Sequence, residues 1–173
     1  MSRQVALLVC LMAASTLRGS VQLLPALPAV FLTAAASGSL FPGYTLCNGA
    51  MALGASAVAL NADGSLNDCT NPTPAGSPVT ILIDGLGPVT PALASGTIAA
   101  APRVFLTPGV AVLDPDLGPI PSTTSSVPGA IAGVAQVRFQ LPKGLAPGPY
   151  AVTPTLAGTP LRERLILIWT RPD

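Results

Sequence analysis

The chain has 173 residues, with 17 Gly and 20 Pro, and its eight Lys or Arg against seven Asp or Glu give a formal net charge of +1. It contains no His, which excludes a histidine general acid or base, a Ser–His or Cys–His nucleophile pair and an imidazole metal site. The near-neutral charge also provides no basic field for nucleic acid.

The composition favours an all-β fold. Half of the residues are hydrophobic and only 9% are charged, so the chain has enough apolar material for a core. Proline lacks a backbone donor and clashes inside a helix, so 20 scattered prolines leave few windows of helical length. Many short strands joined by Gly and Pro turns are therefore predicted.

Residues 1–15 have the layout of a secretory signal peptide. Arg3 provides the positive charge, residues 5–14 form an apolar run, and Ala13, Ala14 and Ser15 form a small-residue cleavage site. This run is about half as long as a membrane-spanning helix needs to be. We expect cleavage after Ser15, or as late as residue 24, and no stable membrane anchor; a buried N-terminal strand or helix is the alternative.

Removal of this leader would leave two of the three cysteines. Cys10 would leave with it, and the residues before Cys10 are not the small ones that a lipoprotein site prefers. Cys47 and Cys69 would remain as an even pair, 22 positions apart, in an oxidising compartment. We predict a Cys47–Cys69 disulfide, worth about 3 kcal/mol; two buried free thiols are the alternative.

Runs of apolar or alternating residues bounded by Gly and Pro predict seven or eight strands. They cover residues 29–33, 55–60, 78–84, 103–106, 110–113, 135–141, 150–156 and 162–170. A hairpin-like turn at residues 107–109 separates two of them, and Pro154 indicates a sheet edge or a bulge. In the last strand Leu165, Leu167 and Trp169 share a predicted core face, and the partly apolar opposite face is expected to be covered too.

Two other segments, residues 37–48 and 114–128, lack such patterning and are predicted to be loops. The second is long for a plain connection, so we expect it to be mobile or a functional insertion. Strands and turns of this kind fit one antiparallel β-sandwich domain over residues 25–173.

Several segments resemble the Solibacter-type C-terminal domain, a module of secreted acidobacterial proteins. They are PAVF at 28–31, ALNADGSLN at 59–67, NPTPAGSPVTILIDGLGPVTP at 71–91 and GAIAGVAQVRFQLPKGLAPGPYAVTPTLAG at 129–158. The resemblance covers about residues 25–170. It implies an exported immunoglobulin-like β-sandwich of about seven strands, with no known activity and no established catalytic residues.

A cluster of oxygen-bearing side chains surrounds Gly64 and resembles a calcium loop; its members are Asn61, Asp63, Ser65, Asn67 and Asp68. A loop of the EF-hand kind needs a bidentate acid at its twelfth position, which here is Pro72. Asn and Asp side chains commonly bond their own backbone in turns. We therefore predict a hairpin turn here and no metal site.

Three other motifs point weakly to catalysis. Asp84 follows an apolar strand, as in an aspartic protease, but the sequence has no second copy for the required dyad. The Gly85-Leu86-Gly87 stretch lacks the third Gly and the helix of a dinucleotide site. Lys143 lies in a turn, where it would not be desolvated for a Ser–Lys pair. We predict no catalytic residues and no cofactor.

Exposed aromatic side chains would be needed for stacking on sugar rings. Tyr44, in the predicted loop FPGYTLC, is the best candidate, and Phe41 could join it in a small patch. Packing of this loop against the sandwich is the alternative.

These observations lead to an expected function. We expect an exported, non-catalytic module with a structural or protein-interaction role, secreted, periplasmic or at the cell surface. Its expected contact surfaces are residues 41–47 and 114–128, and its partner is a protein or a glycan rather than nucleic acid. The alternative is a carbohydrate-binding module that uses Phe41 and Tyr44; a hydrolase is the third, weaker reading.

Overall fold

The structure, a computed structural model, describes residues 28–32, 39–41, 44–47, 50–94, 96–162 and 165–172. The predicted leader, with Cys10, lies outside the described residues, and so do the side chains of residues 39–53. The strands are β1 (Ala29–Val30), β2 (Ser39–Phe41), β3 (Tyr44–Cys47), β4 (Ala50–Leu53), β5 (Ala55–Ser56), β6 (Ala59–Leu60), β7 (Thr73–Pro74), β8 (Pro78–Asp84), β9 (Val89–Thr90), β10 (Val104–Phe105), β11 (Val110–Asp114), β12 (Gly118–Ile120), β13 (Ser122–Ser126), β14 (Ala135–Gln140), β15 (Gly148–Leu156), β16 (Thr159–Pro160) and β17 (Ile166–Arg171).

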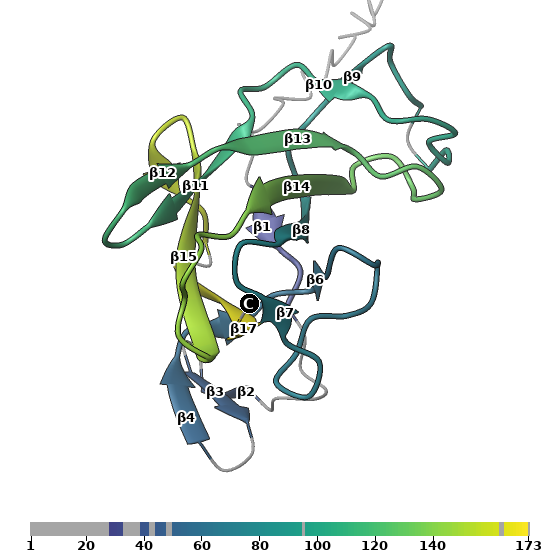
Figure 1. Ribbon diagram of the computed structural model, residues 1–173. Helices are drawn as coiled ribbons and strands as arrows, with labels where there is room; N and C mark the ends of the chain where they lie inside the picture. Colours follow the sequence, from purple (N-terminus) through teal and green to yellow (C-terminus); the bar gives the residue numbers. More distant parts are fainter. Residues whose placement is uncertain are drawn as a thin grey trace, which may run out of the picture.

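Two sheets form the body of the molecule (Figure 1). One has the strand order β1-β8-β14-β13, with β6 also on β8; the other has the order β12-β11-β15-β17-β5, with β16 on β15 and β7 on β17. All pairings in these sheets are antiparallel except those of β5 and β7, which run parallel to β17. The predicted all-β, antiparallel sandwich is confirmed, whereas the immunoglobulin-like strand order stays a prediction.

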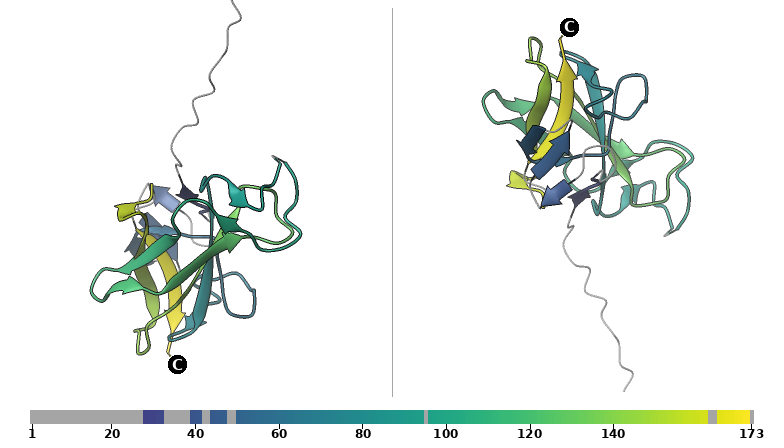
Figure 2. Two further views of the ribbon diagram at one scale, coloured as in Figure 1. Left: turned by 90° about the horizontal axis from the view of Figure 1, so that it is seen from above. Right: turned by 90° about the horizontal axis from the view of Figure 1, so that it is seen from below.

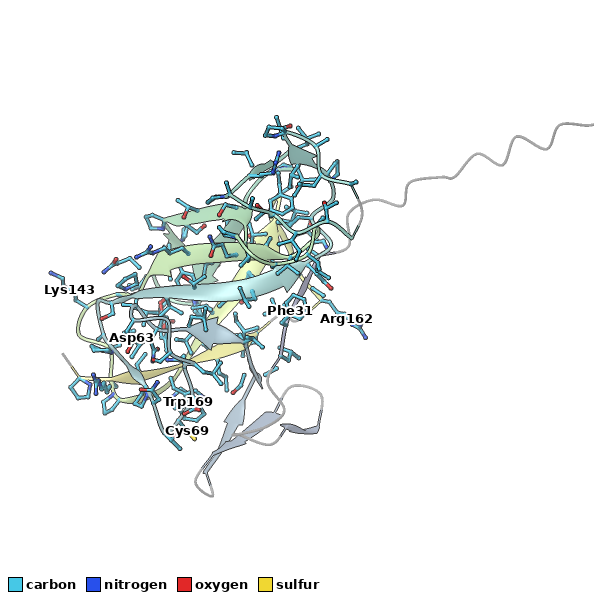
Figure 3. All side chains as sticks on the ribbon, turned by 90° about the vertical axis from the view of Figure 1, so that its right-hand side faces the viewer. Phe31, Asp63, Cys69, Lys143, Arg162 and Trp169 are labelled. Carbon is cyan, nitrogen blue, oxygen red and sulfur yellow. The ribbon has the colours of Figure 1, made fainter. Side chains whose placement is uncertain are left out.

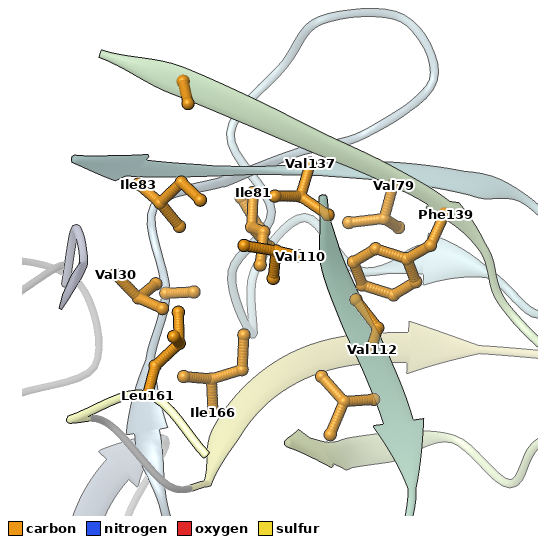
Figure 4. Close-up of a cluster of buried hydrophobic side chains, with 14 of the residues drawn as sticks. Val30, Val79, Ile81, Ile83, Val110, Val112, Val137, Phe139, Leu161 and Ile166 are labelled. Atoms are coloured by element: carbon orange, nitrogen blue, oxygen red, sulfur yellow. The ribbon is translucent and has the colours of Figure 1, made fainter. Parts of the chain in front are cut away.

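The core lies between the two sheets and follows from alternation along the strands. Val79, Ile81 and Ile83 of β8 are buried, while the residues between them are only partly buried. Across the core they meet side chains of the other sheet, among them Val112 and Ile166 (Figure 4). Full burial of each such side chain contributes about 1.5–3 kcal/mol, so this alternation fixes which face of each sheet turns inward.

Both faces of β17 are covered, as the sequence predicts. Ile166 and Ile168 belong to the main core. The main core therefore lies on the face of β17 opposite to the predicted one, which carries Leu167 and Trp169. Leu167 and Trp169 are buried on the other face. There the chain passes so close that a Cβ added to Gly54 would lie 2.8 Å from Leu167 Cδ2.

Residues 55–60, predicted as one strand, form two strands in different sheets. Ala55 and Ser56 pair with β17, and Ala59 and Leu60 pair with β8. The chain changes sheet between these pairs and so connects the two sheets. Figure 2 shows β1 and the C-terminal end of β17 at opposite ends of the body.

The prediction of two loops is wrong. Residues 37–48 include β2 and β3, and residues 114–128 include β12 and β13. All five residues of β13 pair with β14. This strand has the sequence Ser-Thr-Thr-Ser-Ser and no apolar alternation. One of its faces contacts other segments of the fold through hydroxyl groups instead of apolar side chains.

The predicted hairpin at residues 107–109 is also wrong. β10 pairs with β9, and β11 pairs with β12 and β15. Pro154, expected at an edge or a bulge, lies where β15 changes partners. The first five residues of β15 pair with β17, and the last four pair with β11. Because the β17 pairing has ended before Pro154, its missing N–H removes no bond from that ladder.

Candidate functional site

The segment predicted as an aromatic loop is part of a small antiparallel sheet. β2 ends at Phe41 and β3 begins at Tyr44, and these two residues are register partners. The structure therefore brings together the backbones of the two predicted contact residues. Their side chains lie outside the described residues, so an exposed aromatic pair stays a prediction.

The two cysteines of the predicted disulfide lie on segments that approach the same part of the fold. Cys47 ends β3, which lies near β5. Cys69 follows Asn67 by two residues, and the Asn67 side chain is bonded to Trp169 of β17, the strand with which β5 pairs (Figure 3 labels Cys69 and Trp169). Because the side chain of Cys47 lies outside the described residues, the pairing itself stays a prediction.

The turn around Gly64 is a hairpin turn, as predicted. The Asn61 N–H donates to the Ser65 carbonyl at 2.8 Å, and the Gly64 N–H donates to the Asn61 carbonyl at 3.0 Å. Asp63 Oδ1 accepts the backbone N–H of Ser65 at 2.9 Å and its hydroxyl at 2.6 Å. These bonds from Ser65 hold the pKa of Asp63 below its ordinary value.

Asp68 closes a second turn in the same way. Its Oδ1 accepts the N–H and hydroxyl of Thr70, both at 2.7 Å, and the N–H of Asn71 at 2.8 Å. Burial acts to raise the pKa of Asp68, but these hydrogen bonds outweigh it and lower the pKa. Within the described ranges, no group of three or more His, Cys, Asp or Glu side chains could hold a metal ion.

Asn67, another member of the predicted oxygen cluster, points inward and is only 2% exposed. Its Nδ2 donates to the Trp169 carbonyl at 2.8 Å and to Asn61 Oδ1 at 2.9 Å. Its Oδ1 accepts the Trp169 N–H at 2.8 Å. The amide is therefore fully engaged in joining this turn to β17.

A buried carboxylate at the end of β11 was missed by the sequence reading. Asp114 Oδ1 accepts the N–H groups of Asp116 and Leu117 at 2.6 and 2.7 Å, and Oδ2 accepts the hydroxyl of Tyr150. These groups line a groove of about 380 Å³ that also includes Leu145. An Asp followed by Pro and Asp at the end of an apolar strand is a turn signal that could have located it.

The protonation of this pair is set by burial and by the shared hydrogen bond. Burial acts to raise the pKa of Asp114, but the bonds from Tyr150, Leu117 and Asp116 outweigh it and lower the pKa. Burial, followed by the Asp114 bond and charge, raises the pKa of Tyr150 well above its usual range. A phenol that keeps its proton and a carboxylate that stays ionised form a structural link between β11 and β15.

The hydroxyl groups of β13 hold the open side of its sheet to neighbouring segments. The Ser122 hydroxyl donates to the Val110 carbonyl at 2.8 Å, and the Thr124 hydroxyl accepts the Val110 N–H at 3.0 Å. The Ser126 hydroxyl accepts the Arg103 N–H at 2.8 Å. This face of residues 122–126 is therefore bonded within the fold, which corrects the prediction of a mobile loop.

A separate surface carries exposed apolar side chains. It is formed by residues 89–106 and 127–134, here called the apolar lobe. Four of its large side chains, Ile98, Val104, Leu106 and Ile131, are between 60% and 68% exposed. Ile98 and Ile131 are joined by a β-bridge, so two of these side chains come from neighbouring backbones. The sequence reading did not identify this surface, because exposure cannot be told from a run such as TIAAAPRVFL.

The other candidates occupy surface turns. Asp84 is exposed at the end of β8, and Lys143 is exposed in the turn after β14. Trp169, expected in the interior, is buried.

No helix in the described part of the chain is long and apolar enough to cross a membrane. No family model matches the chain, and a search of curated proteins finds no match.

Proposed function

We propose that the protein is an exported, non-catalytic β-sandwich module with a structural or protein-interaction role at or outside the cell surface. The apolar lobe is the observation that carries this proposal. Ile98 and Ile131 are exposed on bridged backbones, and large apolar side chains exposed close together mark contact sites more often than scattered ones do. Here they stand on a body whose sheets are connected by residues 55–60 and by the β13 hydroxyls.

The proposed partner is a protein with an apolar contact surface. The described lobe carries a single charged side chain, Arg103, whose Nη1 donates to the Pro91 carbonyl at 2.7 Å. Apolar burial is strengthened rather than screened by salt. Binding through the lobe is therefore expected to persist in high salt, unlike binding through surface ion pairs.

The lobe can be tested with charge substitutions. The double variant Ile98→Asp/Ile131→Asp should lose retention on cell-envelope material in 1 M NaCl, whereas Thr123→Asp, an exposed change on β13, should keep it. Each folded variant is checked by near-ultraviolet circular dichroism. Equal retention of the double variant and the wild type would contradict the proposed contact surface.

Export forms the second part of the proposal. It is supported by the leader layout of residues 1–15 and by Cys69, which is not a free thiol. We propose Cys47 as its partner, since an oxidising compartment would preserve this pair. Mass spectrometry of the protein from the extracytoplasmic fraction should find a new N-terminus between residues 16 and 25 and a Cys47–Cys69 peptide. A full-length, reduced product in the cytoplasm would refute it.

Membership of the Solibacter-type C-terminal domain is likewise proposed. Its support is the order of the resembling segments, which here include β6 with its turn, β8, β14 and β15. A solved structure of a clear family member would test it. The segment that corresponds to residues 55–60 should pass from one sheet to the other in that structure as well.

A carbohydrate-binding module is the second candidate, and the register pairing of Phe41 with Tyr44 favours it. Two aromatic residues on paired strands could form one stacking surface for a sugar ring. A glycan array should then show binding that Tyr44→Ala abolishes. Tyr150→Phe, which alters only a hydroxyl bonded to Asp114, should leave binding intact. Binding that survives Tyr44→Ala would eliminate this candidate.

A further inference from the structure

An apolar groove lies at one end of the sandwich, between the start of β1 and the hairpin of β15 and β16. It has a volume of about 560 Å³, within the range of small-molecule sites. Pro28 and Ala29 line it from the first sheet, and Leu156, Pro160 and Leu161 line it from the second. The groove thus lies where the two sheets meet solvent.

The floor of the groove is continuous with the hydrophobic core. Leu161 is buried and belongs to the core cluster, as does Val30, next to the groove residue Ala29 (Figure 4). Leu156 packs against the same cluster. A ligand in this groove would therefore place apolar groups against the side chains that close this end of the core.

Among the described residues that line the groove, Arg162 is the one cation. Arg162 lines the groove and is exposed, and Figure 3 shows it extending outward from the body. Its guanidinium makes no hydrogen bond or ion pair with any of the described residues. The negative charge of Asp84 lies on the β8 side of the groove, because Asp84 is the register partner of the groove residue Ala29; Asp84 itself does not line the groove.

We propose that this groove binds an aliphatic carboxylate of the fatty-acid class. The alkyl chain lies along Leu156 and Leu161, and the carboxylate is held by Arg162. A guanidinium matches a carboxylate with two parallel hydrogen bonds, which an alcohol or an amine cannot reproduce. The position of Asp84 orients the ligand, since a carboxylate at the β8 side would meet a like charge.

Calorimetric titration with dodecanoate, below its micelle concentration, tests this site. The wild-type protein should bind one equivalent, and affinity should rise about two- to fourfold for each CH2 added from octanoate upward. Arg162→Gln should weaken dodecanoate binding at least fivefold. Arg138→Gln, a matched change of an exposed arginine on β14, should leave it unchanged. No saturable binding, or equal binding by Arg162→Gln, would overturn the proposal.

Two further variants distinguish binding in this groove from nonspecific adsorption of detergent-like molecules elsewhere on the protein. Arg162→Glu should bind dodecyltrimethylammonium more tightly than dodecanoate, which reverses the wild-type preference. Thr159→Trp, at an exposed position of the rim, should weaken both ligands by filling the groove. An unchanged preference in Arg162→Glu would show adsorption elsewhere and refute the site. The lobe experiment uses other residues, so the two proposals can fail separately.

Discussion

The side chain of Asn67 takes the place of a strand beside Trp169. Along one edge of β17, β5 pairs with Ile166 and Leu167, and β7 pairs with Thr170 and Arg171. Trp169 lies between these pairings, and its N–H and carbonyl are both bonded at 2.8 Å by the Asn67 amide. One side-chain amide thus spans the gap between two short parallel strands and keeps the ladder continuous.

Asn67→Ala should be strongly destabilising. It leaves the buried N–H and carbonyl of Trp169 without partners, which predicts a loss of about 3 kcal/mol in the free energy of unfolding. Urea unfolding followed by the fluorescence of the single tryptophan measures it. Asn67→Asp should be equally harmful, because a carboxylate cannot donate to the Trp169 carbonyl. Asn71→Ala, at an exposed position of the neighbouring turn that Asp68 closes, is the control and should cost less than half as much.

The hydroxyl groups of β13 provide a second test. Thr124→Val keeps the side-chain shape and removes the acceptor of the Val110 N–H, so a loss of about 1–2 kcal/mol is expected. The adjacent Thr123 is exposed, and Thr123→Val should change stability by less than about 0.5 kcal/mol. Hydrogen exchange at the Val110 amide should accelerate in Thr124→Val alone. Equal effects of the two variants would contradict a sheet edge held by Thr124.

Gly54 is required by both its backbone and its neighbour. Its φ is +122°, and an added Cβ would lie 2.8 and 2.9 Å from Leu167 Cδ2 and Cγ. Gly54→Ala should therefore cost about 2–4 kcal/mol, from backbone strain and from displacement of a buried side chain. Gly64 also has a positive φ, +83°, but nothing lies within 4 Å of its added Cβ. Gly64→Ala should cost about 1 kcal/mol, and thermal unfolding of both variants measures the difference.

Stability should fall in acid because three carboxyl groups have lowered pKa values. The hydrogen bonds to Asp63, Asp68 and Asp114 favour the ionised form in the folded protein. A lowered folded-state pKa gives stability that is present above the unfolded pKa of about 3.9 and is lost as the pH falls through the folded pKa. Asp114→Asn should flatten the decline below about pH 4, where the unfolded-state carboxyl begins to bind a proton. An unchanged slope would show that Asp114 does not contribute.

The alkaline limb should depend on Tyr150. Burial and then the bond to Asp114 raise its pKa, so the hydroxyl stays protonated where an ordinary tyrosine ionises, near pH 10. Because the folded pKa is raised, this stability is present below about pH 10 and is lost at higher pH. Absorbance at the tyrosinate band should show a late step that Tyr150→Phe removes. A Tyr150 that titrates near pH 10 in the folded protein would contradict this.

The sequence predicts those strands whose alternation is produced by burial. The strand expected at residues 78–84 coincides with β8, and residues 135–141 contain β14. Both have an apolar residue at every second position facing the core, valine or isoleucine in β8 and alanine, valine and phenylalanine in β14. For such strands the amino-acid pattern and the packing have the same physical origin.

The missed features depend on partners distant in the chain. Five consecutive Ser and Thr residues resemble a loop until β11 and Arg103 supply groups for their hydroxyls. Residues 55–60 resemble one strand until β17 and β8 each pair with one half of it. The Asp114–Tyr150 contact joins residues 36 positions apart. Propensity and periodicity describe neighbours in sequence, so they cannot specify such pairings.

The position of β17 in the second sheet affects when the protein can fold. Residues 166–171 are near the end of the chain, yet β5, β7 and β15 all pair with them. A nascent chain on the ribosome has none of these three pairings until residues 166–171 emerge, because such long-range contacts need both segments present. The second sheet should therefore be completed only after residues 166–171 have been synthesised, whereas the strands of the first sheet, which do not pair with β17, can pair before them.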